Sequence, residues 1–442
     1  MRTFQVAVIG GGAAGVLTVT ALLGTPVHEV ALVDPEPGRG LAYGPAEPWH
    51  LLNSPARAMS AYQGDPAHFL EWCQATDPSA GPGDFMSRRT YGEYLAETLG
   101  VEETAALGRL TLVRDRAVRV LPHQDGGMVV HTRTGELRAD HVVLAVGQGP
   151  ARRLKLAEAV EGDPRYLADP WAPGGLDALP HRAPVLLLGT GLTAVDVLLS
   201  LTERGAEGPV TAVSRHGLLP REHSRGAAEA VGAVTAPEPS KSLAELTRRV
   251  RRLAASVSDW RAAVDLLRPR VDEYWRGLSD AGRDRFARHL ARHWEVHRHR
   301  MAPSVAEKVA RLREKDRFTV RSGGVDAIEP TPEGLAVTIG GRNEIYGAVV
   351  NCTGRDRLTR SDDPLMTGLL ADGLALPGPG GHGLHVNPEG AVRDASGRPN
   401  PALWTVGPPR YGYLWETTAV PEIRLQASVL AERLATGAPL GV

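Results

Sequence analysis

Apolar runs separated by glycines mark the opening of the chain. An apolar run at residues 4–9 ends in three glycines, an apolar stretch at residues 16–23 follows, and another apolar run at residues 30–33 ends on Asp34. Short runs rich in valine favour buried strands, and an apolar stretch that begins directly at a glycine turn favours a helix. The pattern predicts a strand, a turn, a helix and a second strand, as at the start of a Rossmann-like domain.

The same pattern returns near the middle of the chain. An apolar run at residues 184–188 leads into a glycine-bearing turn at 189–194, a helical stretch at 195–201 and another apolar run at 210–213. Two copies of one pattern, in different regions of the chain, predict two dinucleotide-binding domains.

Helical, arginine-rich sequence occupies residues 237–312, where the apolar spacing predicts helices at 244–257, 260–278 and 283–299. Strands return after residue 318. The predicted fold class is therefore α/β, with two Rossmann-like dinucleotide-binding domains and a helical insertion.

A final helix is predicted to run to about residue 434. Pro421 suits the first turn of this helix, because its missing N–H is not needed there. Thr417 or Thr418 is then expected to supply the capping hydroxyl.

The first glycine turn has the spacing Gly10-x-Gly12-x-x-Gly15, with Ala13 and Ala14 between the last two glycines. Gly10 permits a tight turn, Gly12 lets the backbone approach a pyrophosphate, and Gly15 lets the helix lie close to the strand. The helix N-terminus adds amides and a partial positive charge that bind anions. The corresponding residues of the second turn are Gly189, Gly191, Leu192, Thr193 and Ala194.

The two copies differ at the end of their second strand. The first ends in Asp34 and Pro35, where a carboxylate binds ribose hydroxyls, and the second ends in Ser214 and Arg215. A carboxylate repels a 2′-phosphate, whereas an arginine pairs with it. The second site is therefore predicted to prefer NADPH to NADH.

Composition excludes several classes of protein. The 50 basic and 51 acidic residues nearly cancel, so no bulk charge favours nucleic acid or a membrane surface. Apart from the uncharged opening of the chain, no apolar run approaches transmembrane length. The two cysteines, Cys73 and Cys352, are isolated, which excludes a disulfide framework and a CxxC redox pair. Residues 4–27 are uncharged, but their glycine triplet and the acid that follows argue against a signal peptide, so a cytoplasmic protein is expected.

His293 and His297 have the helical spacing of metal ligands, within an arginine-rich stretch at residues 292–300. No acid or cysteine completes a recognisable metal pattern, so no metal is predicted. A solvated or salt-bridged helix face is the favoured interpretation, and a face that contacts the NADPH phosphates is the alternative.

Several motifs extend over nearly the whole chain: both glycine turns, residues 40–44 with 50–53, residues 217–220, residues 297–303 and residues 415–422. With them the chain resembles flavoproteins with two dinucleotide-binding domains, which include Baeyer–Villiger-type and N-hydroxylating monooxygenases. A bacterial subgroup known only as FAD/NAD(P)-binding proteins is more similar still.

The resemblance implies FAD on the first glycine turn and transient NADPH on the second. It implies that residues 1–165 and 346–442 form one FAD domain, interrupted at 166–345 by the NADPH domain with its insertion. Further cofactor-binding residues are expected at Tyr43, Leu52, Asn53, Met59, Val118, Gly147, Thr353, Gly354, Gly407, Trp415, Thr417 and Thr418, and substrate contacts at Tyr411 and Trp415. For Trp415, ordinary core packing is an equal alternative.

The chain also departs from these families. Asp169-Pro170-Trp171 stands without the histidine of the Baeyer–Villiger fingerprint, and the usual Gly-Asp near the C-terminus is Gly407-Pro408. The contact to the flavin ribityl chain therefore falls to backbone amides near Gly407 or to another residue.

The favoured hypothesis is an NADPH-dependent flavoprotein monooxygenase that oxygenates a small nucleophile through a C4a-hydroperoxyflavin. An amine or amino-acid nitrogen is the first choice of substrate, with oxygen as co-substrate. No catalytic side chain is singled out, because no triad or carboxylate pair is present. A flavin dehydrogenase or reductase, and a non-catalytic redox-sensing or partner-binding flavoprotein, are the alternatives. A homo-oligomer is compatible with each hypothesis.

Overall fold

The structure is a computed structural model that describes residues 2–225 and 234–437. Its Cα positions divide the chain into two units. Unit 1 comprises Met1–Pro48, Ser54–Pro150 and Asp356–Val442, and unit 2 comprises Trp49–Asn53 and Ala151–Arg355. The polypeptide thus leaves unit 1 twice, once for only five residues, and returns to it each time.

Unit 1 is built on a sheet with the strand order β15-β16-β6-β1-β2-β3, in which every pair from β16 to β3 is parallel. An antiparallel ribbon, β4–β5, extends from β6. The strands are β1 (Arg2–Ile9), β2 (Val30–Val33), β3 (Leu110–Val113), β4 (Ala117–Pro122), β5 (Met128–Thr132), β6 (Glu136–Leu144), β15 (Ala391–Arg393) and β16 (Pro399–Thr405). The strand β2 is buried throughout, as expected for a parallel strand covered on both faces.

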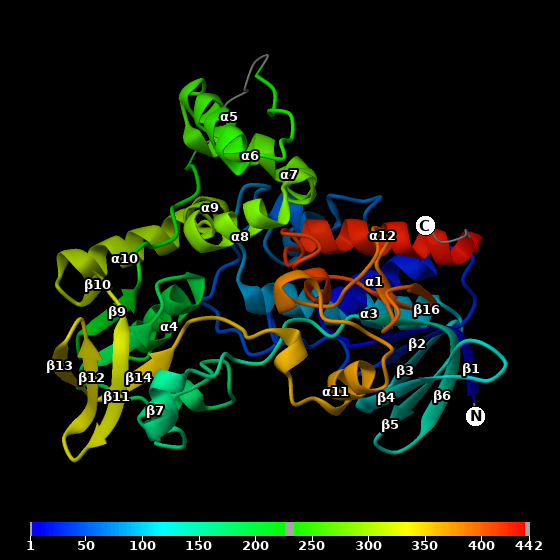
Figure 1. The fold of residues 1–442 in the computed structure, drawn as a ribbon, viewed down its shortest axis with the longest axis horizontal. Coiled ribbons are helices and arrows are strands. Elements are labelled where there is room, and N and C mark those ends of the chain that lie inside the picture. The colour runs from blue at the N-terminus through cyan, green and yellow to red at the C-terminus, as the bar shows by residue number, and fades with distance from the viewer. Residues whose placement is uncertain (1, 226–233, 438–442) are drawn as a thin grey trace. The chain divides into compact units, whose positions relative to one another are not determined.

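The helix α1 lies against α12 and α3 (Figure 1), and nearly all of its residues are buried. This burial explains why its sequence is apolar on all sides rather than along one stripe. On another part of the unit, α11 packs against β4. The helices of unit 1 are α1 (Ala13–Leu23), α2 (His68–Thr76), α3 (Arg88–Ala105), α11 (Pro364–Ala371) and α12 (Val420–Thr436).

Unit 2 contains a five-stranded parallel sheet with the order β10-β9-β8-β14-β7 and a separate antiparallel sheet, β11-β12-β13. Its strands are β7 (Tyr166–Leu167), β8 (Val185–Leu188), β9 (Val210–Ser214), β10 (Phe318–Ser322), β11 (Val325–Thr331), β12 (Gly334–Ile339), β13 (Arg342–Tyr346) and β14 (Ala348–Asn351). The helix α4 (Leu192–Glu203) directly follows β8, and the helix α10 (Pro303–Glu314) directly precedes β10.

The insertion of unit 2 forms its own small core from residues such as Leu246, Leu253 and Leu267. Its helices are α5 (Leu243–Ala255), α6 (Trp260–Leu267), α7 (Val271–Gly277), α8 (Asp280–His289) and α9 (Ala291–Arg298), and α5 to α7 stand away from the parallel sheet (Figure 1). The predicted helices at 260–278 and 283–299 are wrong in extent, because each is broken in two. The first break is a 3₁₀ turn that contains Pro269, which has no N–H for a helical hydrogen bond.

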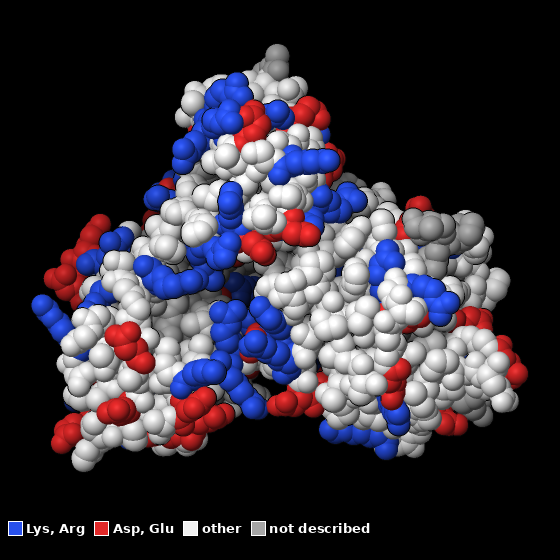
Figure 2. Space-filling view, in the orientation of Figure 1, with Lys and Arg blue, Asp and Glu red and all other residues white. Residues whose placement is uncertain are grey.

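Charged side chains cover the insertion, where basic and acidic residues are interspersed (Figure 2). Glu245 forms ion pairs with Arg248 and Arg249, and Arg292 pairs with Glu295 at 2.5 Å. The pair of Arg292 and Glu295 lies in the stretch at residues 292–300 for which a solvated or salt-bridged face was predicted.

A five-residue strap, residues 49–53, belongs to unit 2. Trp49 Nε1 donates a hydrogen bond to Ser200 Oγ of α4 at 3.2 Å, and His50 Nε2 lies 2.8 Å from the same hydroxyl. At the other end of the strap, His223 Nε2 donates to the Asn53 carbonyl at 3.0 Å. The strap is thus fixed to unit 2 at both ends.

We expect the free energy of unfolding to depend on pH through His223. Burial, helped by the Arg300 guanidinium, lowers the pKa of His223 from about 6.5 to about 4. As the pH falls from 6.5 to 4, the unfolded chain takes up a proton that the folded chain does not, so stability is lost. His223→Gln should remove this component, which amounts to at most about 3 kcal/mol.

The measurement is urea unfolding of the wild type and His223→Gln between pH 7 and 4, with the exposed His289→Gln as the matched control. The wild type and the control should lose stability faster than His223→Gln. Parallel curves for all three proteins would contradict the assignment.

Candidate functional site

The glycine turn of unit 1 joins β1 to α1, and the backbone there is packed too closely to leave room for a side chain at two of its glycines. Gly10 has φ +103°, and a Cβ on it would lie 2.5 Å from the Ala145 carbonyl oxygen. A Cβ on Gly15 would lie 1.8 Å from the Gly10 carbonyl oxygen. These contacts hold the first turn of α1 directly on the ends of β1 and β6.

Gly12 is the N-cap of α1, and neither a capping side chain nor an acidic residue accompanies it. The first amides of a helix have no acceptor within the helix, so this end suits a bound anion. On one side, Gly12 meets Gly40, whose Cα would lie 3.2 Å from a Cβ on Gly12. The loop after β2, which contains Gly40, therefore borders the predicted glycine turn.

Asp34 supports the glycine turn itself. Its Oδ2 accepts a hydrogen bond from the Gly11 amide at 2.7 Å, and its Oδ1 accepts one from the Glu36 amide at 2.8 Å. A carboxylate has more acceptor positions than these two bonds use. Asp34 thus lies beside the turn, as the spacing predicted, and Pro35 follows it on the surface.

The C-terminal loop is tied to α12 by a ring of hydrogen bonds. The Gly407 amide donates to Gln426 Oε1 at 2.8 Å, Thr417 Oγ1 donates to the Gly407 carbonyl at 2.7 Å, and Gln426 Nε2 donates to Thr417 Oγ1 at 3.1 Å. A Cβ on Gly407 would lie 3.4 Å from Ala14 Cβ, so this loop reaches the first turn of α1. The sequence missed Gln426, because a polar residue inside an amphipathic helix gives no distinctive signal.

The ring also corrects the predicted helix cap. Pro421 does lie in the first turn of α12, but the N-cap is Ala419, which has no side-chain capping bond. Thr417 is instead occupied with Gly407 and Gln426, and Thr418 is exposed. The prediction of Thr417 or Thr418 as the cap is therefore wrong.

Tyr411 and Trp415, the predicted substrate residues, lie together in unit 1 with ring centroids 5.4 Å apart. His382 meets Tyr411 edge-on at 5.2 Å. The sequence missed His382, which comes from a separate glycine-rich loop. Trp404, by contrast, is 3% exposed and donates to the Pro401 carbonyl, so it is a core residue.

The other residues predicted for the flavin lie in several places. Tyr43 belongs to a buried aromatic cluster with Tyr91, and burial raises its pKa to about 12. Met59 is buried, and Gly147, with φ +72°, follows β6 with open space beside it. Val118 lies in the β4–β5 ribbon, and Leu52 and Asn53 belong to the strap of unit 2.

The glycine turn of unit 2 repeats the geometry of the first. Gly189 has φ +112°, and a Cβ on it would lie 2.6 Å from the Cys352 carbonyl oxygen. Gly191 is the N-cap of α4, with φ −82° and no capping side chain, and a Cβ on it would meet nothing within 4 Å. Leu192 and Thr193 form the half-buried first turn of α4.

Hydrogen bonds fix the end of β9 to this turn. Thr190 Oγ1 donates to the Leu218 carbonyl at 2.6 Å and lies 2.8 Å from Ser214 Oγ, which accepts from the Gly217 amide at 3.1 Å. Arg215 follows Ser214 and is exposed. The arginine predicted to select the cofactor is therefore held beside the glycine turn.

Buried Asn351 organises the segment after β14. Its Nδ2 donates to the Arg152 and Ala168 carbonyls at 2.8 and 3.0 Å, and its Oδ1 accepts from the amide and the hydroxyl of Thr353 at 3.2 and 2.7 Å. Gly354 follows with φ +88° and open space beside it. The sequence named Thr353 and Gly354 but missed Asn351, whose signal was a polar residue ending an apolar strand.

Both turns fit a dinucleotide. At each, the first glycine is required by the fold, and the helix amide end carries no capping side chain or first-turn acid. The open space at Gly191 shows that the fold alone does not require a glycine there. A turn of this kind binds pyrophosphate through backbone amides.

In the described part of the chain, the two cysteines and the potential metal ligands do not form a second site. Cys73 and Cys352 lie in different units, and burial raises the pKa of both thiols. Within residues 2–225 and 234–437, no group of three or more side chains is placed to hold a metal ion, and no helix is long and apolar enough to cross a membrane.

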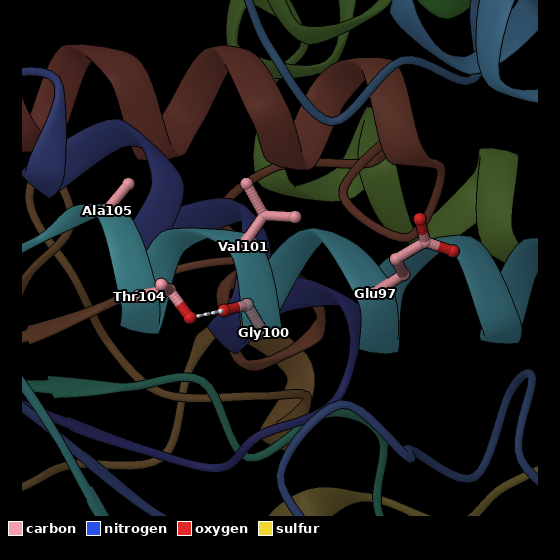
Figure 3. Close-up of a pocket in the computed structure, with 5 residues that line it drawn as sticks. All are labelled: Glu97, Gly100, Val101, Thr104 and Ala105. Atoms are coloured by element: carbon pink, nitrogen blue, oxygen red, sulfur yellow. Dashed lines mark hydrogen bonds between the residues drawn. The ribbon is translucent and has the colours of Figure 1, made fainter.

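A shallow pocket of about 490 Å³ lies on α3 (Figure 3). It is lined by Glu97, Gly100, Val101, Thr104 and Ala105 of that helix, and Glu97 is the one ionisable residue among these five. This pocket has neither the anion-binding amides nor the glycines of the two turns.

Residues 7–149 match a family model described as FAD-NAD(P)-binding. This match includes the first glycine turn and Asp34, and it confirms the predicted dinucleotide-binding sequence there. An uncharacterized protein from Mycobacterium tuberculosis is 24% identical over 421 residues, which covers 79% of this chain and 73% of that protein.

Two solved structures are similar over nearly the whole chain. L-lysine 6-monooxygenase from Pseudomonas syringae is 18% identical, with a TM-score of 0.70, covering 99% of this chain and 100% of that one. The ornithine N-hydroxylase KtzI from Kutzneria sp. 744 is 14% identical, with a TM-score of 0.70 and the same coverage of 99% and 100%. These likenesses confirm the predicted fold class, because the chain shares its fold with both proteins along its length.

Proposed function

We propose that this protein is an NADPH-dependent FAD monooxygenase that hydroxylates the nitrogen of a small amine or amino acid. The observation that carries this proposal is the presence of two dinucleotide-type glycine turns in a chain whose whole length has the fold of amine N-hydroxylating monooxygenases. The proposal includes oxygen as co-substrate and the cytoplasm as the compartment.

FAD is assigned to unit 1. Gly10, Gly12 and Gly15 would hold its pyrophosphate on α1, and Asp34 would bind ribose hydroxyls with its remaining acceptor capacity. Because the Gly407 amide already donates to Gln426, Gly407 contributes by its lack of a side chain rather than by that N–H. Bound flavin would supply electron transfer and oxygen activation.

NADPH is assigned to unit 2. Gly189, Gly191 and Thr193 would hold its pyrophosphate at α4, and the Arg215 guanidinium would pair with the 2′-phosphate. The protein needs no catalytic triad for this reaction, because the cofactors carry the redox chemistry. Its own task is to orient the amine and to exclude water, for which Tyr411 and Trp415 offer apolar rings.

The decisive experiment supplies FAD-loaded protein with NADPH, ¹⁸O₂ and a panel of L-lysine, L-ornithine and cadaverine. Each turnover should consume NADPH, a proton and oxygen, convert the amine to its hydroxylamine, and release NADP⁺ and water. Mass spectrometry should show one ¹⁸O atom in the product. If every amine left NADPH oxidation coupled only to peroxide, a reductase would replace the monooxygenase. Failure of the protein to take up FAD would contradict the assignment of unit 1.

Gly191→Val should abolish NADP⁺ binding without unfolding the protein. The backbone of Gly191 has φ −82°, which valine tolerates, and the added atoms meet no protein atom within 4 Å of the Cβ. They would instead fill the space assigned to the pyrophosphate. The measurement is calorimetric titration with NADP⁺, with thermal unfolding to verify the fold.

Gly64→Val is the matched control, since a Cβ on that glycine also meets open space. It should bind NADP⁺ like the wild type. Unchanged binding by Gly191→Val would show that the nucleotide lies elsewhere.

Arg215→Ala should raise the KM of NADPH by about tenfold or more and the KM of NADH by less than about twofold. The reason is that only NADPH carries the 2′-phosphate. The measurement is the KM of each cofactor for flavin reduction. Arg313→Ala, at another exposed arginine of unit 2, should change neither value. Equal losses for both cofactors would remove Arg215 from this role.

A further inference from the structure

The insertion of unit 2 meets the segment that follows β9. The ring of His216, which directly follows Arg215, lies 6.2 Å from the ring of His293 on α9, with an angle of 41° between the ring planes. Arg215, His216 and His293 are all exposed. Among the described residues, no carboxylate forms an ion pair with any of these three side chains.

Backbone hydrogen bonds fix α9 in this place. The Arg221 amide donates to the Val296 carbonyl at 2.8 Å, the Met301 amide donates to the Arg221 carbonyl at 2.7 Å, and the His223 amide donates to the Met301 carbonyl at 2.9 Å. The segment that makes these bonds is continuous with the end of β9. His293 lies one helical turn before Val296, so it is carried to β9 by the fold.

The other histidine of the predicted pair faces different partners. His297 Nδ1 lies 2.6 Å from the His293 carbonyl, and its ring meets Trp260 edge-on at 4.7 Å. His293 and His297 therefore do not converge on one point. A cation between His216 and His293 would also be repelled by the neighbouring Arg215.

We infer that His293 and His216 join Arg215 to form the binding site for the 2′-phosphate of NADPH. An imidazole can donate an N–H to a phosphate oxygen in either charge state, and a guanidinium adds a full positive charge. Ser214 and Thr190 tie this group to the glycine turn, so it lies where the adenosine end of the cofactor is expected. This inference rests on the proposed assignment of NADPH to unit 2, and it makes the helical insertion a determinant of cofactor choice.

The test measures binding rather than turnover, with two adenosine probes and FAD-loaded protein. Adenosine 2′,5′-bisphosphate carries the 2′-phosphate, and 5′-AMP lacks it. The ratio of their dissociation constants, from calorimetry, isolates recognition of that group. In His293→Ala this preference should fall roughly three- to fivefold, the size expected for an exposed charged contact.

His289→Ala, at an exposed histidine on α8 of the same insertion, is the matched control and should leave the ratio unchanged. Alanine favours helix at both positions, so folding should be kept. The effects of His216→Ala and His293→Ala on the ratio should not simply multiply in the double variant, because both imidazoles act on one phosphate.

An unchanged ratio in His293→Ala, or equal weakening of both probes, would overturn the inference and leave the NADPH assignment intact. If the wild type bound both probes equally, the NADPH assignment itself would fail, and this inference with it. The two failures are therefore told apart by the wild-type ratio.

Discussion

The contact of Gly15 with the Gly10 carbonyl is the constraint around which the rest of unit 1 is arranged. A Cβ at Gly15 would come within 1.8 Å of that oxygen, so any side chain would push α1 off the end of β1. The amide end of α1 would then leave the carboxyl edge of the sheet. In unit 2 the contact of Gly189 with the Cys352 carbonyl after β14 corresponds to that of Gly10 with the Ala145 carbonyl. The position of Gly15 is held there by Ala194, so only the contact at the strand ends is common to both units.

A site made of backbone amides needs other residues to fix that backbone, and here these are polar side chains bonded to main-chain atoms. Asp34 accepts from the Gly11 amide, and Asn351 bonds both Thr353 and the carbonyls of Arg152 and Ala168. Both side chains bond main-chain atoms next to a glycine turn, and neither covers the N-terminal end of the helix. The space over Gly191 stays free of protein atoms because this support comes from neighbouring segments.

The sequence predicted best what depends on neighbouring residues. Both glycine turns could be recognised from the short spacing of their glycines, and the role of Pro421 follows from its missing N–H. The strap could not be predicted, because His50 meets Ser200 across 150 positions of the chain. The helix cap was predicted wrongly for a similar reason: the nearby hydroxyl of Thr417 bonds the Gly407 carbonyl instead. Long-range partners decide these cases, and a single sequence carries no record of them.

His223 connects two parts of unit 2 that are distant in the sequence, the strap and the segment after α9. His223 donates its amide hydrogen bond to the Met301 carbonyl and its ring hydrogen bond to Asn53 of the strap. Burial and the nearby Arg300 lower the pKa of its ring, and the bond to the Asn53 carbonyl acts in the opposite direction without offsetting them.

The same segment pins α9 through Arg221, so the strap and the insertion share one anchor next to the end of β9. The core of α5, α6 and α7 also reaches α9, because Trp294 packs against it. This helix is therefore held on one side by the core of the insertion and on the other by the backbone of Arg221. The insertion is joined to the segment after β9 by α9, and this connection is the physical basis for the proposed part of His293 in binding the 2′-phosphate.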